Sequence, residues 1–154
     1  MRSALYYFYD VMRHKWHVLS EAYKLGILWR GLTHDLSKFN ASERGPRRRL
    51  KNQCSRDAQG NIRVCDELAF SWVWHYHKNP HHWQWWVTTL DDGSCKVFPM
   101  TDEYRREMLA DWRAVARIPG RLDIIPWYRQ NRDRIILHPE TRQWIEEQIG
   151  IPFE

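Results

Sequence analysis

The stretch Trp29-Arg30-Gly31-Leu32-Thr33-His34-Asp35-Leu36-Ser37-Lys38-Phe39 is the part of the chain around which the predicted fold is organised. It sets an imidazole beside a carboxylate in a largely apolar segment, with a lysine one helical turn beyond. His34 and Asp35 can both ligate one divalent ion, and Lys38 can neutralise an anionic substrate. A His-Asp dipeptide alone is a weak signal, because it occurs by chance in many proteins. Its weight comes from further candidate ligands in segments predicted to be helical or helix-terminal: His14, His75, His81, His82 and Asp111.

The composition predicts one folded, intracellular domain spanning residues 1–154. A hydrophobic content of 43% with 10 Trp suits a packed core and argues against disorder. No apolar run approaches the roughly 18–20 residues of a membrane span. Residues 1–10 carry an acid and aromatics where a signal peptide needs an apolar segment. Three cysteines, an odd number, favour a reducing compartment, so we expect a cytoplasmic protein without a membrane partner.

The net charge of +5 is concentrated in one basic run, from Arg44 to Lys51. Such a run suits a phosphate-bearing partner, although a solvated loop or helix face is the simpler interpretation. Residues 44–66 as a whole are predicted to form an exposed loop or insertion. Cys54 and Cys65 lie in it without the two further close ligands that a zinc knuckle needs.

Hydrophobic periodicity predicts an all-α fold with minor irregular β structure. The second predicted helix carries the His-Asp pair and is expected to be mostly buried. Trp72 and Trp74 are expected in the core. A short hairpin is predicted from Val87–Leu90 and Lys96–Phe98 around the turn Asp91-Asp92-Gly93. The predicted helices span residues 3–25, 28–39, 65–79, 102–117, 126–134 and 139–149.

Two imidazoles and two carboxylates on three predicted helices form the candidate metal site: His14, His34, Asp35 and Asp111. Nitrogen and oxygen ligands without a thiolate suit Mn²⁺, Fe²⁺, Co²⁺, Ni²⁺ or Zn²⁺ better than Ca²⁺. Four protein ligands leave open positions only on a five- or six-coordinate ion. A water on such an ion becomes hydroxide near neutral pH and can attack phosphorus.

For two of these four ligands, a nearby residue of the same type is an alternative. Val18 and Ala22 share the helical face of His14, which favours His14 over His17 as the ligand. Glu107 lies four residues before Asp111. Either carboxylate could therefore be the ligand, or both could pair with arginines on the surface.

Three further histidines are assigned to catalysis. His75, His81 and His82 are expected to stabilise charge on the phosphoryl group, to protonate the leaving oxygen or to bind a second ion. Of His81 and His82, we expect one to enter the site. Glu43 is expected to be a surface cap, with action as a base or the orientation of a ligand as the alternatives. His138 precedes Pro139 at a helix start, where capping explains it.

Substrate binding is assigned to three residues. Lys38, which is also a candidate catalytic residue, and Arg30 are expected to hold phosphate oxygens. Trp83 is a candidate to stack on a nucleobase, although core packing is the commoner role of a tryptophan.

The order of His14, His34-Asp35 and Asp111 on helices resembles the HD-domain metal phosphohydrolases. The pattern His14-x-x-x-Val18-x-x-x-Ala22 is similar to the first-ligand helix of that family. Residues 32–38 are similar to its His-Asp-hydrophobic-small-Lys segment. The resemblance implies a compact HD-like helical bundle and metal-dependent phosphohydrolase activity.

Residues 13–150 more closely resemble a family of small uncharacterised phage and bacterial proteins. This resemblance implies a bacterial or phage-infected host cell, and no reaction carries over from that small family. Residues 44–66 match neither pattern, and the loop around His81-His82-Trp83 departs from the broader HD pattern, which leaves the acid and base assignment open. The shared motifs are Trp29–Phe39, Asn79–Trp86 (Asn-x-His-His-Trp-x-x-Trp), Glu107–Trp112 and Ile136–Arg142 (Ile-Leu-His-Pro-Glu-Thr-Arg).

We therefore expect a metal-dependent phosphohydrolase that acts on a nucleotide or related phosphoester, with metal-bound hydroxide as the nucleophile. The alternative is a non-catalytic protein that sequesters a nucleotide or signal molecule. A nucleic-acid-binding accessory protein, using Arg44–Lys51 and the aromatics, is the weakest of the three hypotheses. The sequence leaves open the substrate, the number of ions and the oligomeric state, with a homo-oligomer among the options.

Overall fold

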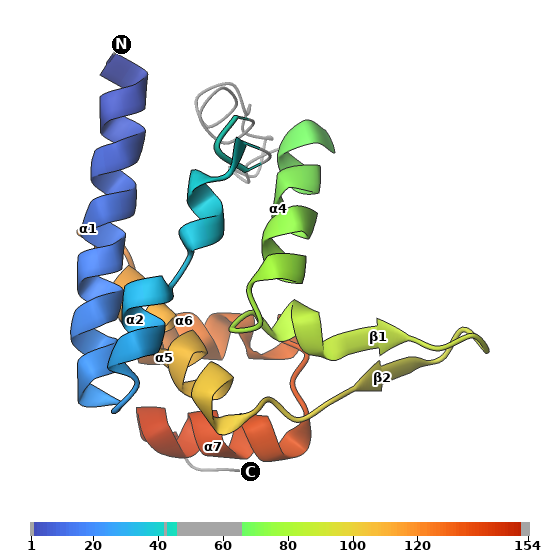
Figure 1. Ribbon diagram of the computed structural model, residues 1–154. Helices are drawn as coiled ribbons and strands as arrows, with labels where there is room; N and C mark the ends of the chain where they lie inside the picture. Colours follow the sequence, from blue (N-terminus) through green and yellow to red (C-terminus); the bar gives the residue numbers. More distant parts are fainter. Residues whose placement is uncertain (1, 42, 46–65, 152–154) are drawn as a thin grey trace.

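The computed structural model describes residues 2–41, 43–45 and 66–151, and these are predominantly helical, with one small antiparallel sheet (Figure 1). The all-α prediction with a minor β element is confirmed. Cys54, Cys65 and most of the basic run lie outside the described residues. The elements are α1 (Arg2–Lys24), α2 (Leu28–Thr33), η1 (Leu36–Phe39), α4 (Asp66–Lys78), η2 (Trp83–Trp86), β1 (Val87–Thr89), β2 (Cys95–Val97), α5 (Asp102–Ala116), α6 (Ile124–Asn131), η3 (Arg132–Arg134) and α7 (Pro139–Ile149).

The prediction of one helix over residues 28–39 is wrong, because the chain breaks at the His-Asp pair. Helix α2 ends at Thr33, and Asp35 then adopts a left-handed backbone with φ 54° before the 3₁₀ helix η1 begins. Aspartate is one of the few non-glycine residues that visit this region readily. The expectation of a mostly buried helix is also wrong, since Leu28, Trp29 and Leu32 are exposed.

Helix α5 is the centre of the described fold, and it packs against α1, α6 and α7. Small side chains let α1 approach α5 closely: Val18 and Ala22 on α1 meet Ala110 and Ala114 on α5. The larger hydrophobic cluster lies on the other side of α5, between it and the C-terminal helices. Its buried members are Met100, Met108, Leu109, Tyr128, Ile135, Leu137, Ile145 and Ile149.

The β-hairpin extends away from the helices (Figure 1), and its strands pair in the register Val87 with Val97 and Thr89 with Cys95. Trp72 and Trp74 on α4 are exposed, so the expectation that they belong to the core is wrong. Within the described residues α4 packs mainly against η1 and η2, which leaves much of its surface without a covering helix. No helix in the described ranges has both the length and the apolar character needed to cross a membrane.

Gly31 on α2 lies so close to α1 that there is no room for a side chain. A Cβ atom added there would lie 2.6 Å from the Cβ of Ala22 and 3.2 Å from the Cα of Leu19. Real Cβ atoms do not approach this closely, so a larger residue would push α2 away from α1. The His-Asp pair directly follows α2, and Gly31 therefore helps to set its position.

We expect Gly31→Ala to lower the free energy of unfolding by about 1–3 kcal/mol, the usual range for overpacking. Urea denaturation followed by circular dichroism measures this change. The matched control places the same substitution in an Ala22→Gly background, where the nearest methyl group is gone. The cost of Gly31→Ala should be smaller there, and equal costs in the two backgrounds would contradict the proposed contact.

Candidate metal centre

Five separate segments of the chain deliver ionisable side chains to one cluster. Helix α1 contributes His14, the turn between α2 and η1 contributes His34 and Asp35, and α4 contributes His75. The loop between α4 and η2 contributes two more histidines, and α5 contributes two carboxylates one turn apart. These last four residues are His81, His82, Glu107 and Asp111.

The four predicted metal ligands are brought together. Nε2 of His14 lies 3.0 Å from Oδ1 of Asp111 and 3.9 Å from Oδ2 of Asp35. Nε2 of His34 lies 3.1 Å from Oδ2 of Asp35 and 3.8 Å from Oδ1 of Asp111. Nitrogen and oxygen atoms at these separations can share one ion. Between His14 and its rival His17, the structure places His14 in the cluster.

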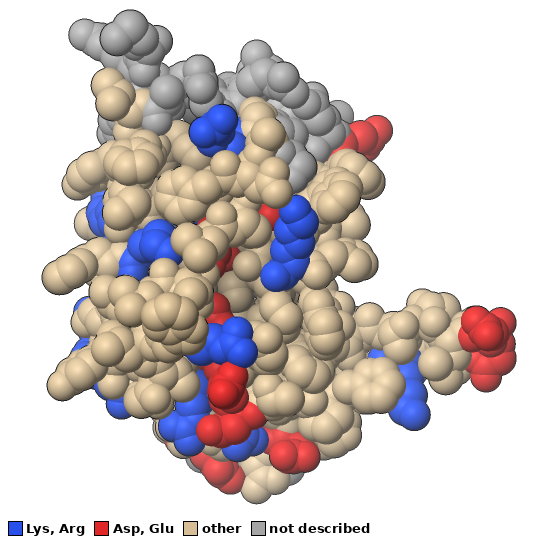
Figure 2. Space-filling view, viewed as in Figure 1, with Lys and Arg blue, Asp and Glu red and all other residues tan. Residues whose placement is uncertain are grey.

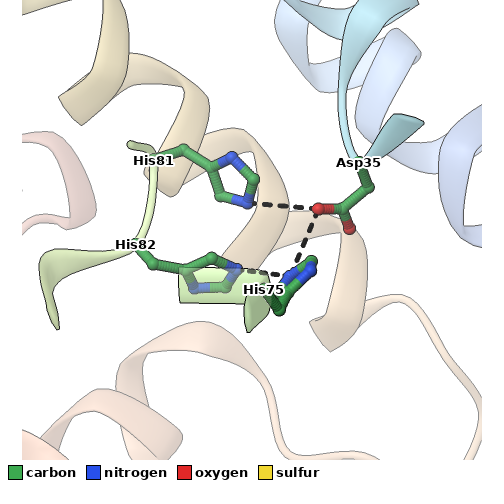
Figure 3. Close-up of side chains that lie close together, drawn as sticks. All are labelled: Asp35, His75, His81 and His82. Atoms are coloured by element: carbon green, nitrogen blue, oxygen red, sulfur yellow. Dashed lines mark hydrogen bonds and ion pairs between the residues drawn. The ribbon is translucent and has the colours of Figure 1, made fainter. Parts of the chain in front are cut away.

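A second group surrounds the other oxygen of Asp35 (Figure 3). Oδ1 of Asp35 lies 3.3 Å from Nε2 of His75 and 3.5 Å from Nε2 of His81. Nε2 of His82 lies 2.8 Å from Nε2 of His75. Both His81 and His82 therefore enter the cluster, where one was expected. The two oxygens of Asp35 face two different groups of imidazoles, which is the arrangement of a carboxylate that bridges two ions.

The ligand atoms themselves fit a metal. Nε2 of His14, His34 and His81 and Oδ1 of Asp35 are buried and form no hydrogen bond within the described structure. Their ion-pair distances are short, but the angles are not those of hydrogen bonds. Buried polar atoms without a partner are rare and costly in proteins, and a cation satisfies them. These His and Asp groups could hold a metal ion.

Two buried glutamates fix which ring nitrogen of His34, His75 and His81 faces the cluster. Oε1 of Glu107 accepts a hydrogen bond from Nδ1 of His34 at 3.0 Å and lies 3.2 Å from Nδ1 of His81. Oε2 of Glu43 accepts from Nδ1 of His75 at 2.8 Å. The proton on each Nδ1 leaves the Nε2 lone pair free for a metal, which is the usual role of a carboxylate behind a metal-binding histidine.

The glutamate roles differ from the sequence expectations. Glu43 is fully buried, so the surface capping role is wrong, and the alternative of orienting a ligand is the one the contacts support. Of the two α5 carboxylates, Asp111 faces the Nε2 atoms and Glu107 the Nδ1 atoms. The spacing of four residues was the only sequence signal for this pair, and it could not separate the two roles.

Two lysines hold the turn that carries the His-Asp pair. Lys38 forms an ion pair with Oδ2 of Asp35. Lys15 on α1 donates to the backbone carbonyls of Leu32 at 3.0 Å and His34 at 2.9 Å. No sequence pattern pointed to Lys15, and its position directly after His14 was the only available hint.

Arg30 and Trp83 do not join the cluster through any described contact. Arg30 donates to Glu103 at 2.8 Å and lies over the ring of Tyr104, on the exposed side of α2. Trp83 packs against the large hydrophobic cluster. His138 accepts a hydrogen bond from the backbone N–H of Glu140 at the start of α7, which is the capping role expected for it.

Comparison with known proteins gives one match. Residues 3–151 match the family model described as a family of unknown function (DUF5662). The chain belongs to this family. No curated protein and no solved structure matches it. Because the family description names no activity, the chemistry of the cluster is the basis on which a function of this DUF5662 member is inferred.

In this DUF5662 member the charges within the cluster favour the ionised forms of His34 and of the carboxylate side chains around it. Burial alone would lower the pKa of His34, but the negative charge of Asp35 beside the ring and the hydrogen bond to Glu107 raise it to about 10. Burial also opposes ionisation of Glu107, yet hydrogen bonds from His34 and His81 lower its pKa to about 2. The pKa values of Asp35 and Asp111 are held well below their usual range by the surrounding histidines. Without a metal, the imidazole of His34 is therefore protonated on both nitrogens and positively charged at neutral pH.

We expect metal binding to release protons and to strengthen with rising pH. A metal ion can bind Nε2 of His34 only after this nitrogen has lost its proton. Binding near pH 7 should therefore release about one proton from this residue. The apparent affinity should rise by up to about tenfold per pH unit and level off near pH 10, the pKa of His34. Titration calorimetry with Mn²⁺ in two buffers of different ionisation enthalpy measures the release. Equal heats in both buffers would contradict this expectation.

Proposed function

We propose that the protein is a metal-dependent phosphohydrolase of the HD type that acts on a nucleotide or a related phosphoester. The observation that supports this most strongly is the buried convergence of ligand atoms on both oxygens of Asp35. The order of the ligands along the chain, and the resemblance of residues 32–38 to the HD segment, agree with it.

Two sets of residues would hold two divalent ions. The first set is His14, His34, Asp111 and Oδ2 of Asp35, and the second is His75, His81, His82 and Oδ1 of Asp35. Mixed imidazole and carboxylate ligands favour Mn²⁺, Fe²⁺, Co²⁺, Ni²⁺ or Zn²⁺. When bound, such ions lower the pKa of a coordinated water and polarise phosphoryl oxygens, which supplies a nucleophile and charge stabilisation at neutral pH.

Part of the cluster reaches the surface formed by the described residues, where a substrate could approach it. His82 and Asp111 are only half-buried, and Figure 2 shows acidic atoms in a hollow at the centre of this face, bordered by α4. The ammonium of Lys38 lies beside Asp35 and is the cation placed to neutralise a phosphoryl oxygen entering the hollow.

The histidines contribute more as ligands than as acids. Nδ1 of His75 and His34 each donates to a glutamate, and their Nε2 atoms face Asp35, so neither nitrogen is free to protonate a leaving group. Burial, aided by the charge of His81, lowers the pKa of His82 well below its usual value. His82 is therefore neutral at pH 7 and suited to metal binding or to accepting a hydrogen bond from substrate.

The test combines metal content with turnover. Protein purified with its bound metal is analysed by elemental mass spectrometry and screened against nucleotides and simple phosphoesters with Mn²⁺, Co²⁺ and Ni²⁺. We expect phosphate release that is lost in His75→Ala and kept in His77→Ala, because His77 is on the same helix but exposed. Phosphate release that persists in the double variant His34→Ala, Asp35→Ala would rule out this assignment. Nucleotide retention without turnover would favour the sequestering protein instead.

A further inference from the structure

Helix α1 carries a second apolar face that is independent of the metal centre. The face consists of Leu5, Tyr9, Met12, Trp16 and Tyr23, which we call the α1 stripe. These side chains are between 43% and 72% exposed, although they are large and apolar. The face of α1 that packs inward carries Val11, His14, Val18 and Ala22 instead. Helix α1 is therefore apolar on two sides, and within the described residues only one of them is covered.

The spacing of the stripe is that of a helix-pairing seam. Leu5 and Met12 are seven residues apart, as are Tyr9, Trp16 and Tyr23, so the stripe alternates steps of four and three residues. Side chains repeated in this way interlock with an identical set on another helix. Leu19 fills the one remaining position of the repeat and packs against Gly31 of α2, whose added Cβ would lie 3.3 Å from Cδ1 of Leu19.

The stripe is large enough to hold two chains together. A large apolar side chain has roughly 150–250 Å² of surface, so the exposed parts of the five residues amount to on the order of 600 Å². Two copies of the stripe would bury about 1,200 Å², the lower end of the range for specific protein interfaces. A patch of this size is at the upper end of what a typical monomer exposes, and such patches often mark an interaction site.

We propose that the α1 stripe is the interface of a homodimer, in which α1 packs against α1 of a second copy of this chain. A membrane surface is a poorer occupant, because helices that lie on membranes flank their apolar face with unpaired basic residues. Beside the α1 stripe, Arg13 is paired with Asp10 at 3.3 Å. Figure 2 shows mainly uncharged side chains projecting along the edge where α1 lies. A seam that repeats every seven residues is what a partner helix of the same sequence can fill.

The test is the mass of the full-length protein in solution. Sedimentation equilibrium over a wide concentration range should give twice the 18.9 kDa of one chain. Tyr9→Glu and Trp16→Glu should each reduce the mass to that of a single chain, since each places a charge in the seam. The matched controls, Leu90→Glu in the hairpin and Ile136→Glu before α7, replace exposed apolar residues outside the stripe and should leave the dimer intact. Far-UV circular dichroism confirms that each variant is folded.

Several outcomes would overturn the proposal. One is a wild-type protein that stays a monomer at every concentration, and another is a dimer that survives both stripe substitutions. A monomer that co-sediments with vesicles of phosphatidylcholine and phosphatidylglycerol would identify a membrane surface as the occupant. A monomer that dimerises only after deletion of residues 46–65 would identify that segment as the part of the chain that covers the α1 stripe. None of these readouts depends on bound metal or on catalysis, so the proposed function stands or fails separately.

Discussion

Replacing Asp35 with Asn is expected to remove bound metal and to lower phosphoester hydrolysis at least about 1,000-fold, equivalent to about 4 kcal/mol in the activation barrier. Asp35 is the residue common to both ligand groups, with His34 on Oδ2 and His75 on Oδ1. An amide is a weak ligand for transition ions, and its NH₂ would point protons at one of these groups. Asparagine tolerates the left-handed backbone at this position, so the turn should survive.

Elemental mass spectrometry and phosphate release measure the effect of Asp35→Asn. The matched control is Asp92→Asn, which makes the same change at an exposed carboxylate in the hairpin turn and should leave both quantities unchanged. A variant at position 35 that keeps two ions per chain would show that Asp35 is not the bridge. Retained ions with lost turnover would instead assign Asp35 to substrate chemistry.

Removing the carboxylate of Glu107 is expected to weaken metal binding by about 10- to 100-fold, although Glu107 itself need not touch an ion. One oxygen of this side chain lies within 3.0 Å of Nδ1 of His34 and 3.2 Å of Nδ1 of His81, so it orients one histidine from each ligand group. In Glu107→Ala both rings lose this acceptor and can rotate or change tautomer. The affinity for Mn²⁺, measured by titration calorimetry, should fall for both ions.

Glu107→Gln separates orientation from charge. The amide oxygen still accepts hydrogen bonds from both Nδ1 atoms, but the negative charge that favours protonated His34 is gone. We expect the Gln variant to bind metal more tightly than the Ala variant. Equal losses in the two variants would mean that the charge of Glu107, and not its acceptor oxygen, supports the site.

The sequence was sufficient for most of the helices and for most of the cluster because both depend on local signals. Pro139 and Gly150 mark the ends of α7, and the helix spans the predicted residues. His14, His34, Asp35 and Asp111 were recognised from residue type and helical spacing, and the structure brings them together. The helical face shared with Val18 and Ala22 favours His14, and the ligand chemistry of His34, Asp35 and Asp111 can be judged from residue type without knowledge of distant packing.

The errors arise where distant packing decides. Glu43 follows an irregular segment, so no helical face could indicate that its carboxylate is buried behind His75. The left-handed turn at Asp35 interrupts a stretch whose composition suits one continuous helix. Trp72 and Trp74 were assigned to the core by residue type, yet α4 has few covering elements among the described residues.

The scattered origin of the ligands has a consequence for the whole molecule. The ions would connect side chains from α1, from α4, from α5 and from the turn that follows α2. Such a connection acts like a covalent cross-link between distant parts of the chain. Chelation should therefore do more than stop the chemistry: stripping the ions should loosen α4, which has few other attachments among the described residues, before the helices around the apolar core melt.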